Sequence, residues 1–141
     1  MTNQNHDELD DAIGAWRRFI DSPSFSSAPV ELRLNALAQA GDLYHARYSA
    51  RKAPEDLDEL LILTDAAVKL APPNAPDRGR YLNNLATLRE VRFHETRDPK
   101  DIGGAIAAFE QAVAAGPPSV HLSKLFVHLG TALVQRYSLL G

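Results

Sequence analysis

A unit of 45 residues recurs along the 141-residue chain, and this recurrence restricts the possible folds more than any other feature. Pro72-Pro73 returns 45 residues later as Pro117-Pro118. An Arg–aromatic pair and a small residue repeat at steps of 45 and 44 residues. They are Arg47-Tyr48, Arg92-Phe93 and Arg136-Tyr137, with Gly41, Ala86 and Gly130. Repeats of this length are typical of stacked helix–turn–helix units, each of which needs its neighbour to bury its apolar face.

The hydrophobic pattern within each unit is helical. Ala and Leu dominate, and apolar residues fall near 3.6-residue spacing, as in Leu57, Leu60 and Leu61, or in Ile102, Ala105 and Ile106. Asp98-Pro99 and Ala53-Pro54 predict helix starts, and Ser119 predicts another. The expected helices span about 7–21, 30–49, 55–71, 77–95, 99–115 and 119–138. The sequence therefore predicts an all-α fold, an α–α superhelix of about six antiparallel helices in a single domain over residues 1–141.

Composition excludes several classes of protein. The chain is 45% hydrophobic, 23% charged and has a net charge of −3, so it can bury a core and lacks the positive field that nucleic acids and anionic membranes require. It has no cysteine, which removes disulfides, thiol catalysis and thiolate metal sites. No apolar run approaches the length of a membrane span, and the N-terminus has no signal-peptide pattern. We expect a soluble, cytoplasmic protein.

The repeated residues resemble the tetratricopeptide repeat (TPR) family. The first-helix pattern of that family, a bulky residue followed by Leu, a small residue and an aromatic, is similar to Leu37, Ala40, Gly41 and Tyr44. It returns as Leu82, Leu85, Ala86, Arg89 and as Phe126, Leu129, Gly130, Leu133. The second-helix pattern is matched by Ala105, Phe109, Ala112 and Pro117. The usual TPR unit has roughly 34 residues, so the 45-residue unit resembles the long variant of many actinobacterial and fungal proteins.

This resemblance implies a TPR-like solenoid whose first-type helices line a concave groove. The groove would hold an extended peptide or a partner helix, because amide and guanidinium groups hydrogen-bond peptide backbones and carboxylates. The implied partner-binding residues are Asn35, Asp42 and His45 in the first such helix; Arg80, Asn83, Asn84, Thr87 and Glu90 in the second; and Lys124 and Thr131 in the third. Val127 and Val134 interrupt the polar groove face and indicate a partly apolar ligand or a partner helix.

Catalytic, phosphate-binding and metal-binding motifs are not visible, so we expect no enzyme, cofactor or metal. Gly103-Gly104 lies inside a helical pattern and lacks the Lys-Ser/Thr of a phosphate loop. His121 and His128 are seven apart, which is not a metal-ligand spacing, and we expect them to be packed or solvated. The acidic run Asp7–Asp11 could chelate Mg²⁺, but a solvated first helical turn is the favoured interpretation.

The repeated arginines leave two interpretations open. Arg47, Arg92 and Arg136 could form a stripe that binds phosphates or acidic peptides. Alternatively, each could pair with an Asp or Glu of the next repeat, which we favour because the adjacent aromatic residue repeats as well. Gly41 and Gly130 are expected to have a packing role, and Trp16 is expected in the core.

The order of the helices is unusual, because the chain opens with a second-type helix and closes with a first-type helix. Two interpretations follow: the chain is a fragment of a longer array, or its last helix pairs with another surface. An uncapped solenoid end exposes apolar surface. We therefore expect Leu125, Leu129, Leu133, Leu139 and Leu140 to be partly exposed or to contact a second copy. Two functions follow as expectations: an interaction module that binds a protein, peptide or partner helix in its groove, or an oligomerising, regulatory segment of a larger signalling protein that associates through its uncapped solenoid ends. A homo-oligomer would form through the C-terminal helix.

Overall fold

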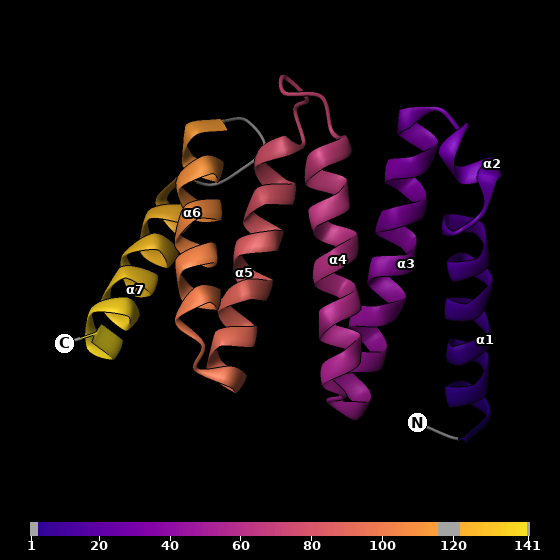
Figure 1. Ribbon diagram of the computed structural model, residues 1–141, viewed down its shortest axis with the longest axis horizontal. Helices are drawn as coiled ribbons and strands as arrows, with labels where there is room; N and C mark the ends of the chain where they lie inside the picture. Colours follow the sequence, from indigo (N-terminus) through magenta and orange to yellow (C-terminus); the bar gives the residue numbers. More distant parts are fainter. Residues whose placement is uncertain (1–2, 116–121, 141) are drawn as a thin grey trace. The chain divides into compact units, whose positions relative to one another are not determined.

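The structure, a computed structural model, describes residues 3–115 and 122–140. Within these residues the chain forms seven helices and no strand, so the fold is all-α, as predicted (Figure 1). The helices are α1 (Asn3–Ile20), α2 (Pro23–Ser26), α3 (Val30–Arg51), α4 (Pro54–Leu70), α5 (Arg78–Thr96), α6 (Pro99–Ala115) and α7 (Leu122–Leu140). The helix start expected at Ser119 lies outside the described residues, as does His121.

A helix lies over each of the six ranges expected from the periodicity, and α2 is an addition. Ser22 caps α2, because its side chain accepts a hydrogen bond from the Phe25 backbone N–H, and Pro23 occupies the first turn. The Phe25 ring packs edge-on against Phe19 at 5.8 Å between centroids. This single turn is too short to produce a hydrophobic period, which is why the sequence pattern did not reveal it.

The 45-residue repeat is visible in how the helices begin and end. The Asp98 carboxylate accepts a hydrogen bond from the Lys100 N–H at 2.9 Å, which confirms the predicted cap before Pro99. At the other end, Lys52 and Arg97 follow α3 and α5 with left-handed φ values of 53° and 59°. Each cation lies over the aromatic ring four residues earlier, Lys52 over Tyr48 and Arg97 over Phe93. The repeated Arg–aromatic pair thus belongs to a repeated helix terminus.

The chain divides into two compact units, residues 1–70 and 71–141, which are described separately. In the first unit, α3 and α4 form an antiparallel pair, and α1 packs on α3 (Figure 1). The core of this unit comes from one face of each helix. Its fully buried members include Ile13, Ala36, Leu37, Ala40, Tyr44, Leu57, Leu60 and Leu63.

In the second unit, α5 and α6 form the corresponding antiparallel pair, and α7 packs on α6 (Figure 1). Six of its buried positions match buried positions of the first unit at a step of 45 residues. Leu82, Leu85, Phe93, Ile102, Ala105 and Ala108 stand where Leu37, Ala40, Tyr48, Leu57, Leu60 and Leu63 stand. Each pair therefore uses the same face of each helix for its core, so the sequence repeat is also a repeat of packing.

Candidate partner-binding surfaces

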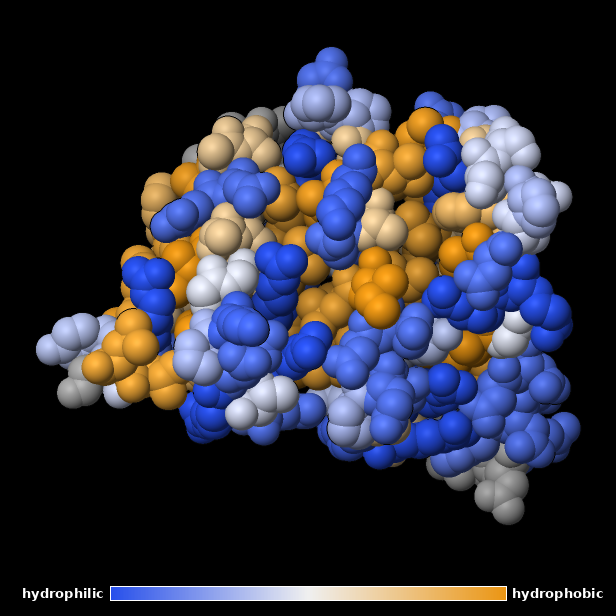
Figure 2. All heavy atoms as spheres, in the orientation of Figure 1, coloured by the Kyte–Doolittle hydropathy of each residue, from blue (hydrophilic) through white to orange (hydrophobic). Residues whose placement is uncertain are grey.

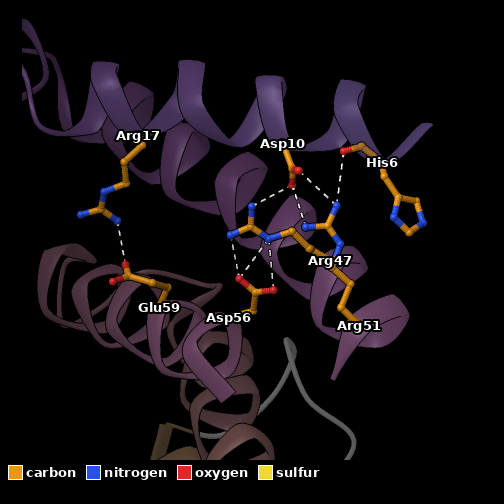
Figure 3. Close-up of polar contacts among 7 residues, drawn as sticks. All are labelled: His6, Asp10, Arg17, Arg47, Arg51, Asp56 and Glu59. Carbon is orange, nitrogen blue, oxygen red and sulfur yellow. Dashed lines mark hydrogen bonds and ion pairs between the residues drawn. The ribbon is translucent and has the colours of Figure 1, made fainter. Parts of the chain in front are cut away.

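Arg47 is the centre of an ion-pair network that joins three helices of the first unit (Figure 3). Its guanidinium donates three hydrogen bonds to the buried Asp56 of α4, at 2.7–3.1 Å. It donates a fourth to Asp10 of α1 at 3.0 Å. Hydrogen bonds between ionised partners are the stronger kind, and the fork of Arg fixes their geometry. The network therefore sets the register of α1 and α4 on α3.

Two further arginines extend this network along α1. Arg51 contacts Asp10 at 3.0 Å, and Arg17 contacts Glu59 of α4 at 2.9 Å (Figure 3). Hydrogen bonds from Arg51 and then Arg47 lower the pKa of Asp10 below its ordinary value. The hydrogen bond to Asp56 is the largest effect that raises the pKa of Arg47. Asp10 therefore belongs to a structural network, whereas Asp7, Glu8 and Asp11 of the same acidic run are exposed.

The three repeated arginines differ in their partners. Arg92 of α5 lies 3.6 Å from Asp101 of α6, which stands 45 residues after Asp56, so Arg47 and Arg92 occupy the same place in their helix pairs. These two arginines confirm a structural role, but the predicted partner was wrong, because each pairs with an Asp of its own helix pair and not of the next repeat. Arg136 of α7 is the third member of the series, and it forms no ion pair with any described residue.

The residues implied by the TPR resemblance lie on three helices in two units. In the first unit, Asn35, Asp42 and His45 are all exposed on α3. In the second unit, Arg80, Asn84 and Thr87 are exposed on α5, whereas Asn83 and Glu90 are half-buried. Lys124 and Thr131 are exposed on α7. The α5 and α7 members of the set lie in the same unit, whereas the α3 members lie in the other.

Helices α5 and α7 are joined in this unit by a side-chain contact, because the Nε2 atoms of His94 and Gln135 are 3.3 Å apart. Helical spacing places the implied residues of each helix within about 100° of that contact, on one surface. The Thr87 and Thr131 hydroxyls donate to the carbonyls of Asn83 and Val127, four residues earlier in each helix. We name this surface, formed by Arg80, Asn83, Asn84, Thr87 and Glu90 with Lys124, Val127, Thr131 and Val134, the α5–α7 face. Val127 and Val134 are 66% and 64% exposed, so it is partly apolar.

A second surface lies on α7 alone, and sequence reasoning identified it only in part. Nine large hydrophobic residues are exposed among the described residues, and seven of them lie on α7. Four share one side of this helix: Phe126, Leu133, Tyr137 and Leu140, with Gly130 between them. We name this side the α7 apolar face. Figure 2 shows hydrophobic residues gathered at the C-terminal end of α7. Monomeric domains seldom expose so concentrated an apolar surface without a partner.

The expectation for the C-terminal leucines needs one correction. Leu133, Leu139 and Leu140 are exposed and Leu129 is half-buried, but Leu125 is only 2% exposed. Leu125 and Ala132 lie on the side of α7 that is buried where the helix packs on α6, about 100° from the α7 apolar face. The family pattern instead marks Phe126, whose ring is 57% exposed. Gly130 has no packing neighbour among the described residues, since no atom lies within 4 Å of a Cβ built there.

Of the other residues considered from the sequence, His128, Trp16 and Gly104 make packing or hydrogen-bond contacts within the fold. His128 packs its ring on Phe109 at 5.7 Å between centroids. Trp16 contacts Phe19 but is half-buried, so its predicted place in the core was wrong. Arg89 donates a hydrogen bond to the Gly104 carbonyl at 3.1 Å, so Gly104 has a structural contact between α5 and α6. In the part of the chain that the structure describes, no three His, Asp or Glu side chains gather so as to hold a metal ion. No described helix combines the length and apolarity needed to cross a bilayer.

No protein family, curated protein or solved structure matches the chain.

Proposed function

We propose that this protein is a non-enzymatic protein–protein interaction module, a TPR-like α-solenoid that binds a peptide or partner helix. The observation that carries this proposal is the α5–α7 face, where Val127 and Val134 are exposed among polar side chains. Such a mixture suits a ligand that offers both backbone polar groups and an apolar side chain. The internal repeat supports a solenoid, because each helix pair reuses the same packing positions.

Asn83 is the side chain on this face best suited to bind a peptide backbone. Its Oδ1 atom is enclosed and accepts no hydrogen bond from the described residues. An unused acceptor in such a place is costly, and a peptide N–H would satisfy it after a small rotation of the amide. Arg80 is exposed nearby and pairs only loosely with Asp77, at 3.5 Å, so it is available to a ligand carboxylate.

The experiment selects peptides from a random library on the wild-type protein and then measures their affinity for variants. We expect the double variant Arg80→Ala/Asn83→Ala to weaken selected peptides about tenfold or more, since it removes a charged and a neutral hydrogen-bonding group. A matched control, Glu110→Ala/Gln111→Ala, changes two exposed residues of α6 away from this face. Equal affinity of the wild type and the Arg80/Asn83 variant would refute the α5–α7 face as the peptide-binding surface.

A second candidate function is self-association through the α7 apolar face. The specific observation in its favour is that Phe126 and Tyr137, 57% and 77% exposed, stand where Leu82 and Phe93 are buried in the α5–α6 pair. Burying such residues is favourable by about 1.5–3 kcal/mol each. The mass of the protein in solution, measured over a range of concentrations, tests this function independently of any peptide.

A further inference from the structure

The α7 apolar face is the same surface that α3 and α5 use to hold their following helix. A Cβ placed on Gly41 of α3 would lie 3.5 Å from Leu60 of α4, and Arg89 of α5 contacts Gly104 of α6. The α7 counterparts of these two residues are Gly130 and Leu133, and both are exposed. Among the described residues no helix covers this side of α7, so its shape and chemistry suit a helix like α4 or α6.

Helix α1 is the complementary surface, because it corresponds to α4 and α6 and, among the described residues, packs mainly on α3, the next long helix of the chain. Its residues Leu9 and Ala12 align with Leu57 and Leu60 of α4 and with Ile102 and Ala105 of α6. All four of those counterparts are buried, whereas Leu9 and Ala12 are only half-buried. Helix α2 covers α1 near its other end, through Phe25 on Phe19. The N-terminal half of α1 therefore keeps a partly open face.

Charge complementarity connects the two open faces. In both complete pairs an Arg of the first helix faces an Asp near the start of the second, Arg47 with Asp56 and Arg92 with Asp101. The corresponding Arg on α7 is Arg136, and the corresponding acid on α1 is Glu8. Both are exposed, and neither has an ion-pair partner in the described part of the chain. Arg47 has a second partner, Asp10 of the preceding helix α1. The residue of α6 that aligns with Asp10 is Gly103, so α6 offers no such carboxylate to Arg136.

We propose that α7 of one copy takes α1 of a second copy as its antiparallel mate, head to tail, with Arg136 facing Glu8. This assignment rests on the second proposed function, self-association, and names its partner surface. The pairing would bury Phe126 and Tyr137 as Leu82 and Phe93 are buried, and it would place Gly130 opposite Ala12. Each copy has one face of each kind, so the contact is heterologous and can add copies at both ends.

The first test measures mass against concentration by sedimentation equilibrium, from micromolar to millimolar protein, because a single helix pair is a small interface and binds weakly. We expect the wild type to associate and Gly130→Leu to weaken association about tenfold or more by steric exclusion. The matched control is Gly103→Leu, where a Cβ also meets no atom within 4 Å. A wild type that stays monomeric, or Gly130→Leu that associates normally, would overturn the proposal.

The second test identifies the partner surface by exchange of charge. Arg136→Glu and Glu8→Arg should each weaken self-association, by about threefold to tenfold, because each places like charges opposite one another. Mixing the two variants should restore association, since the two introduced charges then face each other with opposite sign, and so do the two native ones. Loss of association in Arg136→Glu but not in Glu8→Arg would show that α7 self-associates against another surface. That outcome would overturn the head-to-tail pairing while leaving self-association intact.

Discussion

Helices α5 and α7 carry the same repeat pattern in the same unit, yet one buries it and the other exposes it. In α5, Leu82, Ala86 and Phe93 are enclosed in the pair with α6. In α7, the corresponding Phe126, Gly130 and Tyr137 face outward. A hydrophobic period therefore identifies a helix face that can pack, and the neighbouring helix determines whether it does. The exposed copy shows what the buried copies would present to a partner.

The largest expected effect is on the free energy of unfolding, when the aromatic residues Phe93 and Tyr137, which share one repeat position, are each replaced. Phe93→Ala should reduce the free energy of unfolding by about 3–5 kcal/mol, because the ring is only 2% exposed and its removal leaves a cavity. Tyr137→Ala should change it by less than about 0.5 kcal/mol in the monomer, since the ring is 77% exposed. Urea denaturation at low protein concentration measures both. Similar losses for the two variants would contradict the difference in burial.

The second comparison concerns the two Arg–Asp pairs. Asp56 is buried and accepts three hydrogen bonds from Arg47, so Asp56→Asn should reduce the free energy of unfolding by about 1.5–3 kcal/mol. Asp101 lies 3.6 Å from a more exposed Arg92, and Asp101→Asn should cost less than about 1 kcal/mol. The same urea denaturation assay measures both variants. An equal loss at both positions would mean that the number of Arg–Asp hydrogen bonds does not determine how much each pair stabilises the fold.

A third comparison uses the two repeated glycines. Gly41→Leu should destabilise the protein by about 1–3 kcal/mol, because the Leu60 side chain already lies at contact distance from a Cβ there. Gly130→Leu should instead stabilise the monomer by about 0.5–1 kcal/mol, since leucine is a better helix former and meets nothing. Thermal unfolding of the dilute variants gives the sign directly. Destabilisation by both would indicate a neighbour for Gly130 in the monomer.

Particular residues show how much of this could be predicted from sequence. Pro54, Pro99 and the Asp98 cap act locally, so the starts of α4 and α6 follow from the chain itself. The repeat positions of Leu57 and Ile102 predicted their burial, because a stacked unit reuses its core face. Exposure on α7 could be predicted only in part, since the sequence pattern did not show that Leu125 packs in the α6–α7 contact while Phe126 is exposed. Helix α2 depends on one cap and one ring contact and leaves no periodic signal.

The smallest expected effect concerns stability at acid pH. It compares Asp10 of α1 with Gly103, the residue of α6 at the same repeat position. Arg51 and Arg47 lower the pKa of Asp10 in the folded state. The Asp10 carboxylate therefore stabilises the fold at pH values above its unfolded pKa. This stabilisation disappears below about pH 4, as the pH falls through the lowered folded-state pKa. Asp10→Asn should therefore flatten the acid limb of a plot of stability against pH and leave its neutral-to-basic shape unchanged. The corresponding residue of α6 is Gly103, so Gly103→Ala provides a control that should keep the acid limb of the wild type. An unchanged acid limb in Asp10→Asn would show that the ion pairs of Asp10 with Arg47 and Arg51 add nothing measurable to the free energy of unfolding.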